Sequence, residues 1–296
     1  MITVFLRGGL GNQMFQYVVG LQLAKKNSTP LVLDTTFLND RFPRKEFTYR
    51  TFDLDIFTLQ PQFTLLSKVS SIFPVSGLWA GIDLAWIKLR NMLHLQKFLQ
   101  EKEAHVFDPG VVSATGNVLL YGYWQNEKYF SDIENEVRAA FQFRYPLDDY
   151  ANQLRNEILS SESVAVCSRR GDFVQFTSAR KLMGDTNLSY YDRAISYINE
   201  HVKNPRYFVF ADDIEFCKKH LNLPPSTVYI AKLGPKWSFH LELMSLCKHS
   251  IIANSTFYWW GAWLNQYKNK IVIAPSRWYA DREKQPEIVP KSWIKI

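Results

Sequence analysis

Short apolar runs alternate with longer amphipathic segments along almost the whole chain. Apolar runs of four to eight residues bounded by turn-forming residues predict buried strands, and apolar positions spaced three or four apart predict helices. The first run, residues 2–6, leads through a glycine turn into a helical pattern from Asn12 or Gln13 to Lys26. Further strands are expected at residues 31–34, 118–121, 164–167, 207–211, 228–231, 250–253 and 271–274. This alternation predicts two Rossmann-like α/β domains.

Helices are expected between these strands, at residues 131–141, 189–202, 214–221 and 241–249, with Ser189 as a candidate N-cap. Residues 63–100 carry an apolar pattern with helical spacing, which predicts a pair of core helices. That stretch is too short and too charged to cross a bilayer, although tryptophan beside basic residues also suits a surface at the headgroup layer. The break at Tyr145-Pro146 and the charged run 148–162 separate the two halves. We therefore expect domains at residues 1–160 and 161–296.

Charge and cysteine content narrow the class of protein. The 35 basic and 28 acidic side chains among 296 residues give a net charge of +7, which favours an anionic ligand, a nucleic acid or an anionic membrane surface. Dispersed basic residues and the lack of an RNA- or DNA-binding motif disfavour nucleic acid. Three cysteines without C-x-x-C spacing predict neither disulfides nor a zinc site, and so a reducing cytoplasm. The amino terminus turns polar after one short apolar run, so we expect no signal peptide and a mature chain beginning at Met1.

A pair of arginines follows the most clearly bounded strand. Residues 164–173 read VAVCSRRGDF, which puts Arg169, Arg170 and Asp172 at the carboxyl end of a buried strand. In open α/β sheets, ligands bind at that end. Two guanidinium groups, each a planar fork of donors, match the paired oxygens of a diphosphate. The alternative, from the residues alone, is that one arginine pairs with Asp172 and the other is solvated.

Two further strand ends carry polar side chains. Asp212 and Asp213 follow one strand, and Asn254, Ser255 and Thr256 follow another. Together with the arginines they predict a nucleotide-diphosphate pocket, in which an acid accepts from ribose hydroxyls or a base and a hydroxyl at a helix start donates to phosphate. Plain helix capping by Asp212 or Ser255 is the alternative. No Asp-x-Asp or P-loop spacing occurs, so we expect no metal and disfavour a P-loop kinase.

The amino-terminal strand ends in a glycine turn. Glycines let backbone amides approach a ligand at a helix start, so Gly9, Gly11, Asn12 and Gln13 are candidate contacts for a nucleotide donor. The spacing is not G-x-G-x-x-G, which disfavours a nicotinamide or flavin site. A turn that needs positive φ explains the same glycines without any ligand.

Two aromatic residues stand at the end of the strand at 118–121. Tyr123 and Trp124, followed by Gln125, offer surfaces on which sugar rings stack, so the three are candidate acceptor contacts. Core packing explains the aromatics equally well.

Five motifs together resemble the bacterial α-1,2-fucosyltransferases, in the family's order and through nearly the whole chain. They are GGLGNQMFQY at 8–17, GYWQNEKYF at 122–130, RRGDF at 169–173, FADDIEFCK at 210–218 and LMSLCKHSIIANSTFYWWGAWLN at 243–265. The resemblance implies a GT-B architecture, two Rossmann-like domains facing a central cleft, with the donor held by the carboxyl-terminal domain and the acceptor on the amino-terminal side. It also implies an inverting, metal-independent transfer of L-fucose from GDP-fucose to the 2-hydroxyl of a galactoside, without a cofactor.

By position, Arg169 and Arg170 match the arginine pair of the family's HxRRxD motif and would neutralise the diphosphate leaving group. Asp172 matches its terminal aspartate and is our first candidate for the base, or for a residue that orients one. The chain departs from the family at two positions: Cys167 stands where the family has histidine, and His240 where it has an acid three places before LMS. If both flank the nucleotide base, the base contacts differ while the phosphate contacts are kept.

The expected function is therefore that of a galactoside α-1,2-fucosyltransferase in bacterial surface glycan (O-antigen) synthesis, located in the cytoplasm. The expected partners are GDP-fucose and a galactose-terminated oligosaccharide, and not a nucleic acid. A lipid-linked acceptor and a peripheral contact with the inner face of the cytoplasmic membrane stay open. The competing readings are another sugar-nucleotide transferase on the same fold and, less favoured, a basic nucleic-acid-binding protein.

Overall fold

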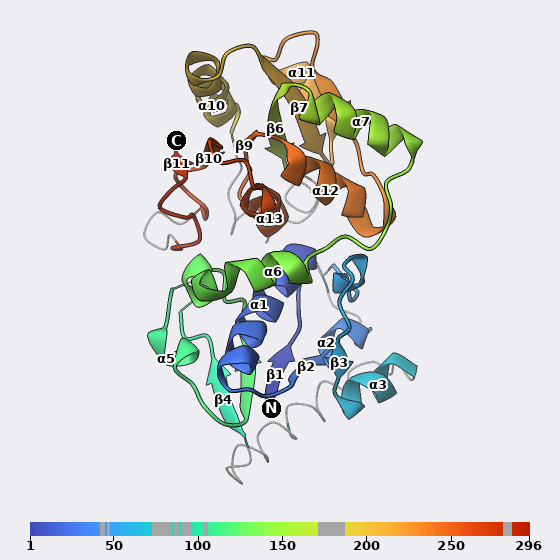
Figure 1. Ribbon diagram of the computed structural model, residues 1–296, viewed down its shortest axis with the longest axis vertical. Helices are drawn as coiled ribbons and strands as arrows, with labels where there is room; N and C mark the ends of the chain where they lie inside the picture. Colours follow the sequence, from blue (N-terminus) through green and yellow to red (C-terminus); the bar gives the residue numbers. More distant parts are fainter. Residues whose placement is uncertain are drawn as a thin grey trace. The chain divides into compact units, whose positions relative to one another are not determined.

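The computed structural model describes residues 1–41, 45, 48–72, 85, 89, 96–103, 106–170, 187–280 and 286–296. It divides the chain into two compact units, Met1–Gln142 and Phe143–Ile296, coloured from blue to green and from green to red in Figure 1. Each unit is an α/β structure built on its own parallel sheet. The predicted α/β class with two Rossmann-like domains is confirmed.

The first unit is built on a five-stranded parallel sheet in the order β3-β2-β1-β5-β4. Its strands are β1 (Ile2–Phe5), β2 (Leu31–Asp34), β3 (Gln62–Phe63), β4 (Lys97–Gln100) and β5 (Val118–Tyr121). Its α-helices are α1 (Leu10–Lys26), α2 (Thr36–Asn39), α3 (Leu65–Ile72), α5 (Pro109–Val112) and α6 (Glu134–Ala140). Short 3-10 turns lie at η1 (Leu54–Ile56), η2 (Glu127–Tyr129) and η3 (Ser131–Ile133).

Helix α1 packs on the central strand β1 through the apolar positions that predicted it. Met14, Phe15, Val18, Val19 and Leu23 are all fully buried. Each such side chain contributes about 1.5 to 3 kcal/mol of transfer free energy. Because β1 lies at the centre of the sheet, this packing fixes the start of α1 beside the carboxyl end of β1, where the glycine turn lies.

The second unit is built on a six-stranded parallel sheet in the order β11-β10-β9-β6-β7-β8. Its strands are β6 (Glu162–Ser168), β7 (Pro205–Ala211), β8 (Val228–Ile230), β9 (His249–Ile251), β10 (Val272–Ala274) and β11 (Ile294–Lys295). Its helices are α7 (Asp149–Leu159), α10 (Leu188–His201), α11 (Ile214–His220), the 3-10 turn η4 (Pro235–Trp237), α12 (Ser238–Leu246) and α13 (Thr256–Leu264). Strand β6, which carries the arginine pair at its end, lies between β7 and β9, where both faces are buried.

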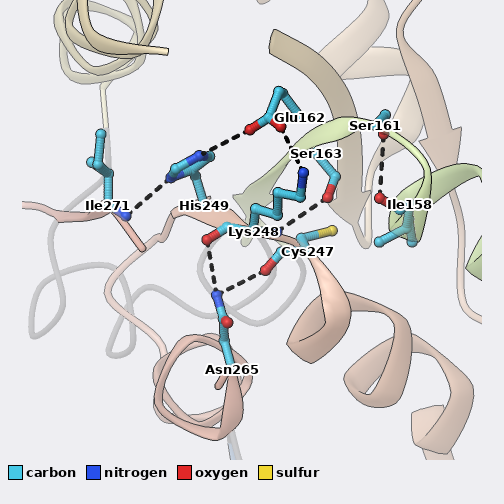
Figure 2. A network of polar contacts seen from close by, with 9 residues as sticks. All are labelled: Ile158, Ser161, Glu162, Ser163, Cys247, Lys248, His249, Asn265 and Ile271. Carbon is cyan, nitrogen blue, oxygen red and sulfur yellow. Dashed lines mark hydrogen bonds and ion pairs between the residues drawn. The ribbon is translucent and has the colours of Figure 1, made fainter. Parts of the chain in front are cut away.

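A polar network closes the amino ends of β6 and β9 (Figure 2). The ammonium of Lys248 lies 2.6 Å from one carboxylate oxygen of Glu162, and Nε2 of His249 lies 3.9 Å from the other. Nδ1 of His249 accepts a hydrogen bond of 3.0 Å from the backbone N–H of Ile271. Asn265 donates to the carbonyls of Cys247 and Lys248. Since parallel strands all run the same way, this network stands at the opposite end of the strands from the arginine pair.

The structure corrects several sequence-based boundaries. Within residues 63–100 we expected helices; α3 is one, and residues 85 and 89 are also helical, but residues 97–100 form strand β4. The pattern could not show this because β4 has one neighbour strand, β5, and is only partly buried, so it lacks the continuous apolar run of a central strand. The remainder of that stretch, apart from residues 85, 89 and 96, falls outside the described residues.

Smaller differences in element and domain boundaries arise where a capping side chain or a packing contact, rather than the spacing of apolar residues, sets the boundary. Asn187, not Ser189, is the N-cap of α10, since its side chain accepts from the backbone N–H of Tyr190 at 3.0 Å. The division between the units falls after Gln142 rather than after residue 160, because α7 packs against α12 and its Glu157 pairs with Arg206 of β7. Strand β11, two residues long, had no detectable pattern.

Candidate active site

The carboxyl ends of β6 and β7 bring together the two arginines and the two aspartates that the sequence singled out. Ser168 and Ala211 are paired in the ladder, so the residues after them face one another. Nε of Arg169 lies 3.8 Å from Oδ2 of Asp212, and Nε of Arg170 lies 3.5 Å from Oδ2 of Asp213. Each arginine is therefore paired with an acid from the neighbouring strand. Asp172 lies outside the described residues.

The four side chains are held by backbone contacts as well as by charge. Oδ1 of Asp212 accepts from the backbone N–H of Arg170 at 2.9 Å, which fixes the turn after β6. Asp213, rather than Asp212, is the N-cap of α11, accepting from the N–H of Phe216 at 3.0 Å. The Cζ atom of Arg170 lies 3.5 Å from the centre of the Phe216 ring. Both arginine side chains are about a quarter exposed, so their forks remain accessible to an anion.

The third strand end belongs to the same edge of the sheet. Ser255 is the N-cap residue of α13, although its side chain makes no capping bond within the described chain. Tyr258, in the first turn of α13, donates to the carbonyl of Ser168 at 2.9 Å, which ties the start of this helix to the end of β6. Asn254 is 2 % exposed and donates to the carbonyl of Trp278. Ser255 and Thr256 thus stay candidates for a phosphate contact, while the amide nitrogen of Asn254 is engaged inside the unit.

Cys167 and His240, the two departures from the family motif, lie on facing elements. The sulfur of Cys167 is 3.3 Å from the sulfur of Met244, which is four residues after His240 on α12. Residues four apart on a helix share one face, so His240 lies one turn from the Cys167 contact. His240 packs against Phe210, the ladder partner of Cys167, with 5.1 Å between ring centres. No hydrogen bond joins Cys167 to His240 in the part of the chain described.

The imidazole of His240 is neutral and only half satisfied. Burial lowers the pKa of His240 to about 4. Its Nδ1 lies 3.3 Å from the carbonyl oxygen of Ala231, which can only accept, so Nδ1 carries the proton. Nε2 is then a buried acceptor, and it has no hydrogen-bond partner among the described residues. The rings of Trp237 and Phe257 lie 5.2 and 5.9 Å away. A donor N–H from a ligand is the complement that this nitrogen lacks.

In the first unit, the glycine turn is held by Gln13. Gly8 adopts φ +80°, and a Cβ there would come within 2.5 Å of the Asn12 side chain, so the position needs glycine. The amide of Gln13 donates to the carbonyls of Gly8 and Thr51 and accepts from the N–H of Asp53. Gln13 is fully buried, and its amide is used in clamping the turn rather than exposed to a donor.

A cavity of about 200 Å³, which we call the first cavity, opens over this turn. Gly9, which we expected to contact the donor, is in its wall together with Asn12, while Gly11 is buried in α1. The wall also includes Asp40, which is 1 % exposed, and Arg50. In the sequence, residues 39–57 form a loop-like stretch rich in charged and aromatic residues. That composition is the sequence signal that points to Asp40 and Arg50.

The predicted acceptor residues divide into one that lines the first cavity and two that support it. Tyr123 lines it, with the Cζ atom of Arg7 4.3 Å from its ring centre. Trp124 is 1 % exposed and adopts φ +56°, a left-handed conformation that is rare for a bulky residue. Gln125 donates to the side chain of Asn12 at 2.8 Å. A sugar ring could therefore stack on Tyr123, whereas a face of Trp124 is not open to one.

Glu101, which the sequence did not single out, positions this turn. Its two carboxylate oxygens accept from the backbone N–H groups of Tyr123 and Trp124, at 2.8 and 3.1 Å. Gly122 allows the close approach, because a Cβ there would come within 2.5 Å of Glu101 Cβ and 2.9 Å of the Trp124 indole. Nothing in the pattern around residue 101 could have shown a partner 22 residues away.

Among the residues that the structure describes, no group of three or more histidine, cysteine, aspartate or glutamate side chains is arranged to hold a metal ion. No helix in this part of the chain is long and apolar enough to cross a membrane.

Two units, each with its own parallel sheet, and an arginine pair after the central strand β6 of the second are the fold class of the GT-B glycosyltransferases. The family model described as "Glycosyl transferase family 11" matches residues 1–296, and the chain belongs to this family. An Escherichia coli "Alpha-1,2-colitosyltransferase" is 34% identical over 299 residues, covering 100% of this chain and 98% of the relative. The E. coli "O-antigen biosynthesis glycosyltransferase WbnK" is 29% identical (98% and 99% covered). The Bos taurus "Galactoside 2-alpha-L-fucosyltransferase SEC1" is 24% identical (99% and 73%).

Solved structures with a similar fold include a NodZ α-1,6-fucosyltransferase soaked with GDP-fucose. Its TM-score is 0.49 at 13% identity, with 89% of this chain and 91% of that one covered. An Arabidopsis thaliana FUT1 mutant in complex with GDP gives a TM-score of 0.49 at 10% identity, with 99% and 75% covered.

Proposed function

We propose that the chain is an inverting glycosyltransferase that moves L-fucose from GDP-fucose to the 2-hydroxyl of a galactoside acceptor. The observation that carries the proposal is the arginine pair at the end of β6, held by the two aspartates at the end of β7. A GDP leaving group needs its growing negative charge balanced at the diphosphate. Two permanently charged, partly exposed guanidinium groups at a ligand-binding strand end supply that balance.

The ion pairs of this site are loose enough to accept a diphosphate. The Nε to Oδ2 distances of 3.8 and 3.5 Å exceed the hydrogen-bond range of about 2.7 to 3.2 Å. The aspartates therefore orient the guanidinium groups electrostatically. Nε of Arg170 is buried and has no hydrogen-bond partner among the described residues, so a phosphate oxygen that reached it would satisfy this donor. In the transfer, the acceptor oxygen forms a bond to the sugar's C1, the bond from C1 to the β-phosphate oxygen breaks with its electron pair going to GDP, and the hydroxyl proton passes to a base.

Two carboxylates are candidates for that base. Asp172, two residues after Arg170, matches the aspartate of the family motif. Asp40 is the second candidate, because it is a nearly buried carboxylate in the wall of the first cavity, where Tyr123 offers a ring for an acceptor sugar. Substituting each by asparagine and comparing the pH dependence of kcat separates a base from a residue that orients one.

The guanine base has a complement in His240. Its unpaired Nε2 accepts one hydrogen bond, which suits an N–H of the base. His240 is itself fully buried, so the base would have to enter between the partly exposed rings of Trp237 and Phe257 to reach this nitrogen. Among the other expected donor contacts, Ser255 and Thr256 stand at the start of α13 and Asp212 and Asp213 beside the arginines. We do not assign Cys167 a polar contact, because burial raises the pKa of its thiol and the side chain is fully enclosed.

A second donor is favoured by one observation, the 34% identity to an α-1,2-colitosyltransferase over the whole chain. Colitose is fucose without the hydroxyl at carbon 3, so the same site accommodates both sugars unless a side chain hydrogen-bonds that hydroxyl. The acceptor we propose is a galactose-terminated oligosaccharide of an O-antigen, lipid-linked or free, at the inner face of the cytoplasmic membrane or in the cytoplasm. The transfer needs no metal and no cofactor in this proposal.

One experiment tests donor, acceptor and metal together. The purified chain is incubated with GDP-fucose, GDP-colitose, GDP-mannose or UDP-galactose, with galactose-terminated or glucose-terminated acceptors, and with or without EDTA. We expect GDP release and a 2-linked product with one of the first two donors and a galactosyl acceptor, unaffected by EDTA. Transfer of mannose or galactose instead would overturn the donor assignment, and loss with EDTA that one divalent ion restores would overturn metal independence. A salt titration against RNA and DNA tests the nucleic-acid alternative.

A further inference from the structure

The first unit holds a second cavity, which shares a turn with the first one. It measures about 300 Å³, at the lower end of small-molecule sites. Trp124 lines it, whereas the preceding residue, Tyr123, lines the first cavity. Glu101 is in its wall and holds the backbone N–H groups of both residues. Since consecutive Cα atoms lie about 3.8 Å apart, the two cavities adjoin on one stretch of backbone.

The wall of the second cavity combines an aromatic surface with hydrogen-bond acceptors. The ring of Phe107, which is partly exposed, packs 4.9 Å from the ring of buried Tyr129. Glu103 is exposed, and its carboxylate makes no hydrogen bond with the described residues. Asp108 uses Oδ1 to cap α5, through the N–H of Gly110 at 2.8 Å, and Oδ2 makes no hydrogen bond to the residues that the structure describes. These oxygens need donors, and sugar hydroxyls or an acetamido N–H supply them.

One polar group in the wall of the second cavity is a donor that needs an acceptor. The indole Nε1 of Trp124 is buried and has no hydrogen-bond partner in the described part of the protein. A buried N–H left unpaired costs about 1 to 3 kcal/mol, so an acceptor oxygen reaching it from the cavity would recover free energy. The left-handed φ of +56° at Trp124 is the backbone strain that brings this ring against the cavity. A ligand with both donors and acceptors on a ring, beside an apolar face, satisfies all of these groups.

We infer that the second cavity binds the second sugar of the acceptor, the one to which the terminal galactose is joined. This inference rests on the proposed function, because it takes the first cavity as the galactose site. The wall includes three carboxylates and the ammonium of Lys102, and the ammonium of Lys128 lies 5.7 Å from the centre of the Phe107 ring. The carboxylates still outnumber these two ammonium groups, so the second sugar is neutral, a hexose or N-acetylhexosamine and not a uronic acid. Phe107 provides the apolar face, and Glu103 with Asp108 accepts from the polar edge.

The test compares acceptors that differ only in the second sugar. The full chain transfers to methyl β-galactoside, to a galactosyl-N-acetylhexosamine and to a galactosyl-uronic acid, with the donor that supports activity. For the wild type we expect kcat/KM on the neutral disaccharide to exceed that on the monosaccharide about tenfold or more. This is the gain that contacts to one additional sugar ring typically give. Phe107→Ala should lower that ratio about tenfold through KM. Tyr150→Ala, an exposed aromatic of the second unit (52 % exposed), is the matched control and should keep the ratio.

A charge reversal gives an independent readout. Glu103→Lys should raise the rate on the uronic acid acceptor relative to the neutral one by about threefold or more, since an ammonium replaces a carboxylate at the wall. Suppose that the wild type transfers to galactose-terminated acceptors while neither variant changes its ratio of kcat/KM values between acceptors by more than about twofold. That result would overturn the second-sugar site alone. Failure of the wild type to transfer to any galactosyl acceptor would overturn the proposed function, and this inference with it.

Discussion

The guanidinium carbon of Arg170 lies 3.5 Å from the centre of the Phe216 ring. Phe216 is in the first turn of α11, whose cap, Asp213, also pairs with the same arginine. The position of the Arg170 guanidinium is thus set by the Phe216 ring, the Asp213 carboxylate and the start of α11 together. A lysine has neither the plane nor the fork that this arrangement holds.

We expect Arg169→Ala and Arg170→Ala each to lower kcat by about two orders of magnitude or more, the range for removing one charge-stabilising donor. Lysine at either position should restore little. GDP release measured under saturating donor checks this, with thermal unfolding to confirm the fold. If both alanine variants fold and turn over at near the wild-type rate, the diphosphate contact has been placed on the wrong residues.

Asp213 carries two roles that one pair of substitutions separates. Asp213→Ala removes the cap of α11 and should lower the free energy of unfolding by about 0.5 to 2 kcal/mol. Asp213→Asn keeps the capping oxygen but removes the charge that orients Arg170, so it should lower kcat with little change in stability. Urea unfolding and steady-state kinetics on both variants give the two readouts. Equal stability losses in the alanine and asparagine variants would contradict the separation.

Stability should fall in acid because of His240. Its pKa is lowered to about 4 by burial, against about 6.5 in the unfolded chain. Between these values the unfolded chain binds the proton and the folded chain does not, so the free energy of unfolding decreases as the pH falls from 6.5 to 4, by about 3 kcal/mol. Burial also lowers the pKa of His249, which adds in the same direction.

The measurement is urea unfolding at pH 7 and pH 4.5 for the wild type, His240→Phe and His249→Phe. His240→Phe should weaken the pH dependence more than His249→Phe, because His240 is the more deeply buried of the two. A pH dependence identical to that of the wild type in His240→Phe would show that this imidazole is already accessible to protons in the folded chain.

The pair Cys167 and His240 should behave as coupled positions. Cys167→His alone sets an imidazole opposite an imidazole, while Cys167→His with His240→Asp restores the acid and imidazole of the family pattern. The double variant should bind GDP-fucose more tightly than either single one, as is expected only for neighbouring residues. Their placement on facing surfaces of β6 and α12 supports this. Strictly additive changes in KM across the cycle would favour two independent packing positions.

The sequence predicted most of the central strands because each is buried on both faces and reads as a continuous apolar run. Residues 207–211 and 164–167 are the clearest cases, and the polar residues after them did meet at one edge. The sequence did not predict edge strands such as β4 and β11, since these bury few side chains and carry no continuous apolar run.

What sequence could not provide was the pairing of side chains across space. The sequence placed Asp212 and Asp213 at a strand end, but it could not show that each pairs with one of the arginines, which follows because strand order places β7 beside β6. For Trp124 the sequence left stacking on a sugar and core packing open; the side chain is 1 % exposed, and its backbone N–H is held by Glu101, 23 residues earlier. A local pattern shows which end of a strand carries polar residues, but strand order decides which of them become neighbours.

The hold of Glu101 on Tyr123 and Trp124 has a bearing on how such enzymes diverge. One carboxylate sets the backbone of the turn, so substitutions at Phe107 and Glu103 need not move Tyr123, where we propose that the terminal sugar binds. In that proposal, glycan preference and transfer chemistry are encoded at separate positions. A lineage could switch from one surface polysaccharide to another by exchanging a few side chains of a single wall, while Glu101 keeps the turn in register.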